Sequence, residues 1–147
     1  MKRMHIHISV ENLAANIEFY SALFGSKPSV IQSDYAKWML DDPRVNFAIS
    51  NRGARPGLDH LGIQAENNNE LNELAARLET ASLPARSEPG AQCCYAKGDK
   101  HWTVDPQGIA WESFHTLASI PTFGSEPVTE RACCAPQPAT IKFGRRA

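Results

Sequence analysis

The chain has 147 residues, of which 42% are hydrophobic and 21% charged, and its net charge is −1. This length and balance are typical of one compact globular domain with a sizeable core. A chain so close to neutral has no general attraction to nucleic acid or to an acidic membrane, and its basic start leads into an apolar run interrupted by histidines, unlike a signal peptide. We therefore expect a cytoplasmic protein that acts on small molecules, with no nucleic acid or membrane as partner.

Two segments of the chain follow the same order of elements. Each begins with a strand, continues with a helix whose apolar residues recur at helical spacing, and goes on to short strands. Short words also recur: Tyr35-Ala36-Lys37 returns as Tyr95-Ala96-Lys97. Internal duplication explains these matches better than chance does. The pattern predicts strands at residues 4–10, 36–40, 45–50 and 58–64, and helices at 13–24 and 69–82.

Histidines from both segments are expected on one concave surface. His5 and His7 share a face of the first strand, because residues two apart in a strand point the same way, and His60 has the same kind of position in the second segment. Glu112 interrupts a later apolar strand, where a carboxylate needs a partner to offset its desolvation. A metal ion on His5, His60 and Glu112 would supply that partner, and His7 is an equal alternative to His5 on these grounds.

Adjacent cysteines occur twice, at Cys93-Cys94 and Cys133-Cys134. Consecutive Cα atoms are about 3.8 Å apart, below the usual disulfide range of roughly 4.4 to 6.8 Å, so such a pair is better suited to chelation. Thiols kept reduced in the cytoplasm bind soft centres such as trivalent arsenic, cadmium or zinc. Chelation by Cys93 and Cys94 requires a loop, since adjacent side chains in a strand point to opposite faces.

These residues together resemble the vicinal-oxygen-chelate superfamily, which includes glyoxalase I, extradiol dioxygenases and bleomycin-resistance proteins. The matching features are His5 ahead of the first helix, His60 within residues 58–62, and the turn at residues 105–108 followed by Glu112. The resemblance covers roughly residues 4–116 and favours His5 over His7. It implies an α+β fold of paired βαβββ modules that form a curled mixed sheet around a metal site.

The resemblance also implies a domain organisation. We expect the vicinal-oxygen-chelate domain over residues 1–117, with modules at about 1–52 and 56–117. Residues 118–147 are rich in Pro, Gly, Thr and Ser, which predicts a flexible tail that carries Cys133-Cys134. The oligomeric state stays open, because paired modules can complete a site within one chain or by exchange in a homodimer.

Cys93-Cys94 and the residues that follow, up to Trp102, are similar to a narrower group, the organoarsenical carbon-arsenic lyases and cadmium-induced proteins. This implies that the thiols bind a trivalent organoarsenical, alkyl or aryl, while Fe(II) on His5, His60 and Glu112 uses dioxygen to cleave the carbon–arsenic bond and release arsenite. Glyoxalase I has a further carboxylate where this chain has Ile49, and two histidines with one carboxylate suit an oxygenase. Nickel, cobalt or zinc could replace iron in a purified sample.

Tyr95, Lys100 and Trp102 complete the expected substrate site, with Trp38 and Phe47 as further candidate walls. Aromatic residues on strands are part of the core at least as often, and a lysine in a loop is more often solvated than bound to substrate. Two alternative functions remain. One is a resistance protein that binds cadmium or arsenite without catalysis, and the other is a glyoxalase-type metal-dependent isomerase or thiol transferase.

Overall fold

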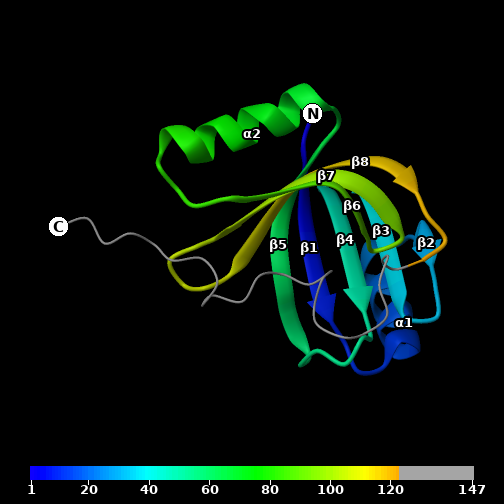
Figure 1. Ribbon diagram of the computed structural model, residues 1–147. Coiled ribbons are helices and arrows are strands. Elements are labelled where there is room, and N and C mark those ends of the chain that lie inside the picture. Colours follow the sequence, from blue (N-terminus) through cyan, green and yellow to red (C-terminus); the bar gives the residue numbers. More distant parts are fainter. Residues whose placement is uncertain (123–147) are drawn as a thin grey trace. The chain divides into compact units, whose positions relative to one another are not determined.

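The computed structural model describes residues 1–122, so Cys133-Cys134 lies outside the described residues (Figure 1). The chain divides into two compact units, one of residues Arg3–Leu61 and one that combines Met1–Lys2 with the chain from Gly62 on. The elements follow the order βαβββ twice, and the strand pairs are both parallel and antiparallel. The predicted α+β class with paired βαβββ modules is therefore confirmed.

The two sets of elements correspond one to one along the chain. The first set consists of β1 (Arg3–Ser9), α1 (Leu13–Phe24), β2 (Val30–Ile31), β3 (Tyr35–Asp41) and β4 (Arg44–Ser50). The second consists of β5 (Gly57–Ala65), α2 (Asn68–Thr80), β6 (Arg86–Cys93), β7 (Ala96–Val104) and β8 (Ala110–Ser119).

The first unit packs α1 against one face of its strands. β1 pairs in parallel with β4, and β4 pairs antiparallel with β3. The Tyr20 ring on α1 packs against that of Phe47 at a tilt of 51°, with 4.5 Å between the ring centroids, and Trp38 is completely buried beside them. Trp38 and Phe47, considered above as walls of a pocket, therefore belong to the hydrophobic core. Because side chains alternate along β1, His5 and His7 lie on the face opposite this core.

The second unit is an antiparallel arrangement in which β8 pairs with β7 and β7 pairs with β6. Asn67 caps α2 by accepting a hydrogen bond from the backbone N–H of Glu70. α2 buries Leu71 and Leu74 and contacts β8. β2 and β6 were not predicted, because β2 has only two residues and β6 carries Pro89 and Gly90 without alternating apolar residues.

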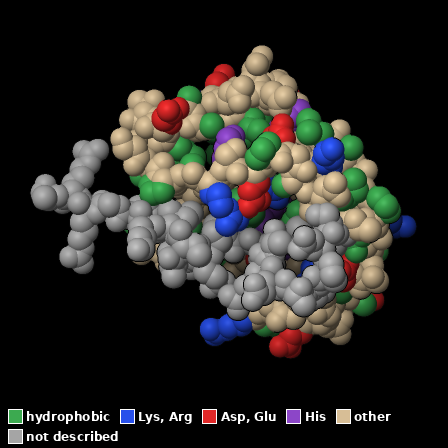
Figure 2. Space-filling model, viewed as in Figure 1, with side chains coloured by type: hydrophobic (Ala, Val, Ile, Leu, Met, Phe, Trp, Pro, Cys, Tyr) green, Lys and Arg blue, Asp and Glu red, His purple; other side chains and the backbone are tan. Residues whose placement is uncertain are grey.

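Charged side chains of both signs are mixed on the face shown in Figure 2, where the described residues form no broad area of one sign. This distribution agrees with the net charge of −1. No helix within residues 1–122 combines the length and the apolar character that crossing a membrane would need.

Candidate functional site

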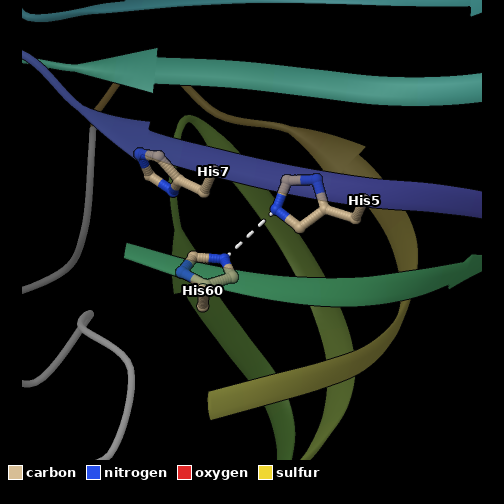
Figure 3. Close-up of side chains that lie close together, drawn as sticks. All are labelled: His5, His7 and His60. Carbon is tan, nitrogen blue, oxygen red and sulfur yellow. Dashed lines mark hydrogen bonds between the residues drawn. The ribbon is translucent and has the colours of Figure 1, made fainter. Parts of the chain in front are cut away.

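His5 and His60 point toward each other in the first unit, one from β1 and the other from β5 (Figure 3). Both side chains are buried, and their Nε2 atoms are 3.1 Å apart. The other ring nitrogen of His5 faces the backbone carbonyl of Asn46 at 3.0 Å, and that of His60 faces the Asp59 carboxylate at 2.5 Å. Carbonyl and carboxylate oxygens only accept hydrogen bonds, so each Nδ1 donates and each Nε2 is the atom suited to bind a metal.

The geometry of this histidine pair fits a metal ion. Nitrogen ligands bind first-row metal ions at about 2.1 Å, so two that bind side by side are about 3 Å apart. The separation of 3.1 Å between the Nε2 atoms of His5 and His60 meets this requirement. Both rings also have the oxygen partners that usually orient histidine ligands.

His7 is a third member of the same cluster. It is buried, and its ring lies at 69° to that of His60 with 4.8 Å between the centroids. Its Nε2 atom lies 2.9 Å from the hydroxyl oxygen of Ser50. One ligand atom from each of His5, His7 and His60 lies within 4.8 Å of the others. Both histidines that the sequence offered as alternatives therefore lie beside His60.

Glu112 and Lys100 form a buried ion pair in the second unit. The register of β7 and β8 places Trp102 opposite Glu112, which puts Lys100 diagonally across from the carboxylate. The distance from Nζ to Oε1 is 2.6 Å, and the two side chains are only 10% and 8% exposed. Lys100 is thus a strand residue with a carboxylate partner, and the suggestion that it is a solvated loop lysine was wrong.

The charge of Lys100 is stabilised by its surroundings. Burial lowers the pKa of this lysine, but the Glu112 carboxylate and the nearby thiols of Cys93 and Cys94 raise the pKa by more, so the net shift is upward. The ammonium group also lies 5.5 Å from the centroid of the Trp102 ring. Lys100 therefore stays protonated near neutral pH and offsets the desolvation of Glu112.

Cys93 and Cys94 lie at the turn between β6 and β7. Cys93 ends β6 and pairs with Ala96, which leaves Cys94 and Tyr95 as a two-residue hairpin turn. Both turn residues have left-handed backbones, with φ of 55° and 61°, as type I′ hairpin turns require. The two sulfur atoms are 3.3 Å apart, beyond a disulfide bond length of about 2.05 Å. Because the two cysteines meet at a turn, their thiols lie side by side, whereas adjacent side chains in a regular strand would point to opposite faces.

Several predicted site residues share one face of the second unit's strands. Cys93 lies opposite Ala96, and residues 96, 98, 100 and 102 alternate onto one face of β7, so Cys93 lies on the same face as Lys100, Trp102 and Glu112. Trp102 is buried and donates from Nε1 to Glu88 at 3.3 Å. The second unit thus brings the thiols and the carboxylate to one face, and the histidine cluster belongs to the first unit.

The hydrogen-bond and ion-pair partners of the predicted ligands were not predicted from the sequence. Asp59 had a visible signal, since it directly precedes His60 in the sequence. The backbone carbonyl of Asn46 had none, because its contact with His5 depends on the parallel pairing of β1 with β4. The pairing of Lys100 with Glu112 likewise depends on the register of β7 and β8.

Comparison with known proteins identifies the family to which this chain belongs. A family model described as the Glyoxalase/Bleomycin resistance protein/Dioxygenase superfamily matches residues 2–113, and the chain belongs to this superfamily. Its likeness to a Mn(II)-bound glyoxalase from Novosphingobium aromaticivorans has a TM-score of 0.58 at 19% identity, over 89% of this chain and 44% of that one, and supports the fold.

Relatives with known names are closer in sequence. The chain is 39% identical over 145 residues to the trivalent organoarsenical cleaving enzyme of Bacillus sp. (strain MD1), which covers 97% of this chain and 88% of that protein. It is 37% identical over 128 residues to the cadmium-induced protein CadI of Mycobacterium tuberculosis (strain ATCC 25618 / H37Rv), which covers 86% of this chain and 84% of that one. These relatives match the group that the sequence resembles.

Proposed function

We propose that the protein cleaves the carbon–arsenic bond of trivalent organoarsenicals, using Fe(II) and dioxygen, and releases arsenite. The observation that carries this proposal is the thiol pair of Cys93 and Cys94, whose sulfur atoms lie 3.3 Å apart at a hairpin turn. Trivalent arsenic is a soft centre that takes thiolate ligands. The named relatives support the same chemistry, because two of the curated proteins similar to this chain are called trivalent organoarsenical cleaving enzymes.

In the first step, the thiols of Cys93 and Cys94 replace the two hydroxyl groups of an organoarsonous acid, and two water molecules leave. Arsenic then keeps its carbon substituent and gains two sulfur ligands. The turn already holds the sulfur atoms side by side, so binding requires little ordering of the chain. The Lys100 ammonium interacts with both thiols, which places a positive charge near the sulfur atoms that would bind arsenic.

Ferrous iron, when bound, would supply the activation of dioxygen that the cleavage needs. His5, His60 and Glu112 are the proposed ligands. The Asn46 carbonyl and the Asp59 carboxylate keep the two imidazoles oriented with Nε2 available.

The overall reaction balances with one molecule of dioxygen. For methylarsonous acid, the products are arsenous acid and formaldehyde: one oxygen atom becomes the carbonyl oxygen of the aldehyde, and the other completes a hydroxyl group on arsenic. The carbon is oxidised, dioxygen is reduced, and arsenic remains trivalent. We place this reaction in the cytoplasm, where thiols such as Cys93 and Cys94 are kept reduced.

The test is a single-turnover reaction. Protein loaded with Fe(II) under anaerobic conditions is mixed with methylarsonous acid, air is admitted, and arsenite and formaldehyde are quantified. We expect both products in equal amounts from the unaltered protein and from Cys133→Ser, which keeps the hairpin thiols. We expect neither product from Cys94→Ser or Glu112→Gln, whereas Glu79→Gln, which changes an exposed carboxylate, should retain activity.

Other outcomes would favour the alternative functions. Stoichiometric binding of cadmium without any arsenite release would contradict catalysis and favour sequestration, as the name of the cadmium-induced relative suggests for that protein. Turnover of methylglyoxal with glutathione would favour a glyoxalase-type isomerase. Arsenite release that persists in Glu112→Gln would remove this carboxylate from the proposed iron site.

A further inference from the structure

The histidine cluster of the first unit contains one more imidazole than the proposed iron site uses. His5 and His7 are two residues apart on β1, so both project from the same face of the strand, and the His60 ring on β5 faces both of them in Figure 3. His7 is only 4% exposed, as deeply buried as its two neighbours. A third buried imidazole at this position requires a physical explanation, because an ordinary surface histidine would face water.

The orientation of His7 resembles that of a metal ligand. Its Nε2 atom lies 2.9 Å from the Ser50 hydroxyl oxygen, which can accept the ring N–H in the way that Asn46 and Asp59 do for the other two rings. With the proton held there, the Nδ1 atom of His7 carries the lone pair. When the ring N–H of His7 faces Ser50, the hydroxyl orients the imidazole as oxygen partners commonly orient histidine ligands.

The distances within the cluster are close to those of a common site. One ligand atom from each of His5, His7 and His60 lies within 4.8 Å of the others. Nitrogen atoms on opposite sides of one ion are at most about 4.2 Å apart. Joint binding of one ion therefore requires the three rings to move closer together.

We propose that His7 is a metal ligand together with His5 and His60, so that the first unit alone contributes a three-imidazole set. This inference rests on the proposed function, because it concerns the same metal ion. It also adds a ligand from the first module: His7 lies on the same face of β1 as His5, whereas Ile49, which aligns with Glu112 in the sequence, is buried in the core on the opposite face. Neutral imidazoles are good ligands for Fe(II), Co(II), Ni(II) and Zn(II).

The test counts ligating histidines in the protein loaded with Co(II). Each imidazole bound to this paramagnetic ion gives an exchangeable, strongly shifted ring N–H signal in the NMR spectrum of histidine-labelled protein. We expect such signals from His5, His7 and His60 in the unaltered chain. Binding of Co(II) at cysteines adds no ring signal, so the count is specific to imidazoles.

Variants identify each signal and its contribution to affinity. His7→Gln should remove one signal and weaken Co(II) binding by about tenfold or more, and Ser50→Ala, which keeps the imidazole, should shift the same signal. His115→Gln is the control, because this histidine bonds to Asn68 in the second unit and should change neither property.

The outcomes separate this inference from the proposed function. If His7→Gln keeps every shifted signal and the full affinity while His5→Gln and His60→Gln lose them, His7 is not a ligand and the proposed iron site stands. If neither His5→Gln nor His60→Gln weakens Co(II) binding, the ion is not held by the histidines and both proposals fail. The signal count of the unaltered protein decides the matter even if a variant does not fold.

Discussion

Lys100 and Glu112 form an ion pair across β7 and β8, with 2.6 Å between Nζ and Oε1 and both side chains buried. The pair explains how a carboxylate can occupy an otherwise apolar strand, since a buried charge is tolerated only when it is compensated. It also gives Lys100 a structural role that is distinct from contact with substrate. The predictions below begin with this pair.

Replacing Lys100 should destabilise the protein by leaving Glu112 without its cation. We expect Lys100→Met to lower the free energy of unfolding by about 3–5 kcal/mol, and by much less when Glu112→Gln is already present, because the carboxylate is then gone. Lys97→Met is the control, since Lys97 is exposed on the same strand. The measurement is chemical denaturation of chelator-treated protein. An equal loss for both lysine variants would contradict the pairing.

The same pair predicts a pH dependence. The pKa of Lys100 is raised in the folded state by Glu112, against the lowering effect of burial. A raised lysine pKa contributes stability that is fully present below the ordinary value and is lost only as the pH rises through the folded value. The stability advantage of the unaltered protein over Lys100→Met should therefore not fall as the pH rises from about 7 to 9. A difference that shrinks within this range would contradict the shift.

Asp59 should control metal affinity through His60. Its carboxylate lies 2.5 Å from Nδ1 of His60 and fixes the ring so that Nε2 faces His5. We expect Asp59→Asn to weaken Zn(II) binding by about 10- to 100-fold, because partners of histidine ligands typically have effects of this size. Competition with a chromophoric chelator gives the affinity. Asp41→Asn removes an exposed carboxylate of the same unit and should leave it unchanged.

Tyr95 should be a strained position of the hairpin turn. Its φ of 61° lies in the left-handed region, which costs a residue with a Cβ atom about 1–2 kcal/mol. Tyr95→Gly and Tyr95→Ala both remove the ring, but only glycine relieves the backbone. We expect the glycine variant to be more stable than the alanine variant by about 1 kcal/mol in thermal or chemical unfolding. Equal stabilities would show that this backbone is not strained.

Gly62 should be required for close packing of β5 against β8. A Cβ atom at this position would lie 2.4 Å from the backbone oxygen of Glu112, and one at Gly98 would lie 2.4 Å from that of His115. We expect Gly62→Ala and Gly98→Ala each to lower the free energy of unfolding by about 1–3 kcal/mol, which a lower melting temperature would reveal. Only Gly62→Ala should also weaken metal binding, because it displaces Glu112. Equal metal affinity in the two variants would contradict a role of Glu112 as ligand.

Much of the fold could be predicted from local patterns. Alternation along β1 placed His5 and His7 together on the face away from the core, and helical spacing located α1 and α2. The duplicated order of elements indicated paired modules. The strand β6 could not be predicted, because its sequence of exposed and half-buried residues has no apolar period, and it is held mainly by pairing with β7.

The details of the site depended on contacts between residues distant in sequence. No local pattern indicates that Lys100 pairs with Glu112, since this requires the register of β7 and β8. The turn at Cys94 and Tyr95 was also hidden, because type I′ turns are usually marked by Asn and Gly. The sequence could therefore show that adjacent thiols need a loop but could not place them in one.

The 3.1 Å separation of the Nε2 atoms of His5 and His60 suits a proton as well as a metal ion, since it is also a hydrogen-bond distance. Both Nδ1 atoms face oxygen acceptors, so a proton shared between the Nε2 atoms would be an additional one on the pair. A metal ion and that proton compete for the same lone pairs. Binding of the proposed metal ion would therefore release a proton, and acidification would favour loss of the ion. Proton binding and metal binding would thus exclude each other at this pair of nitrogen atoms.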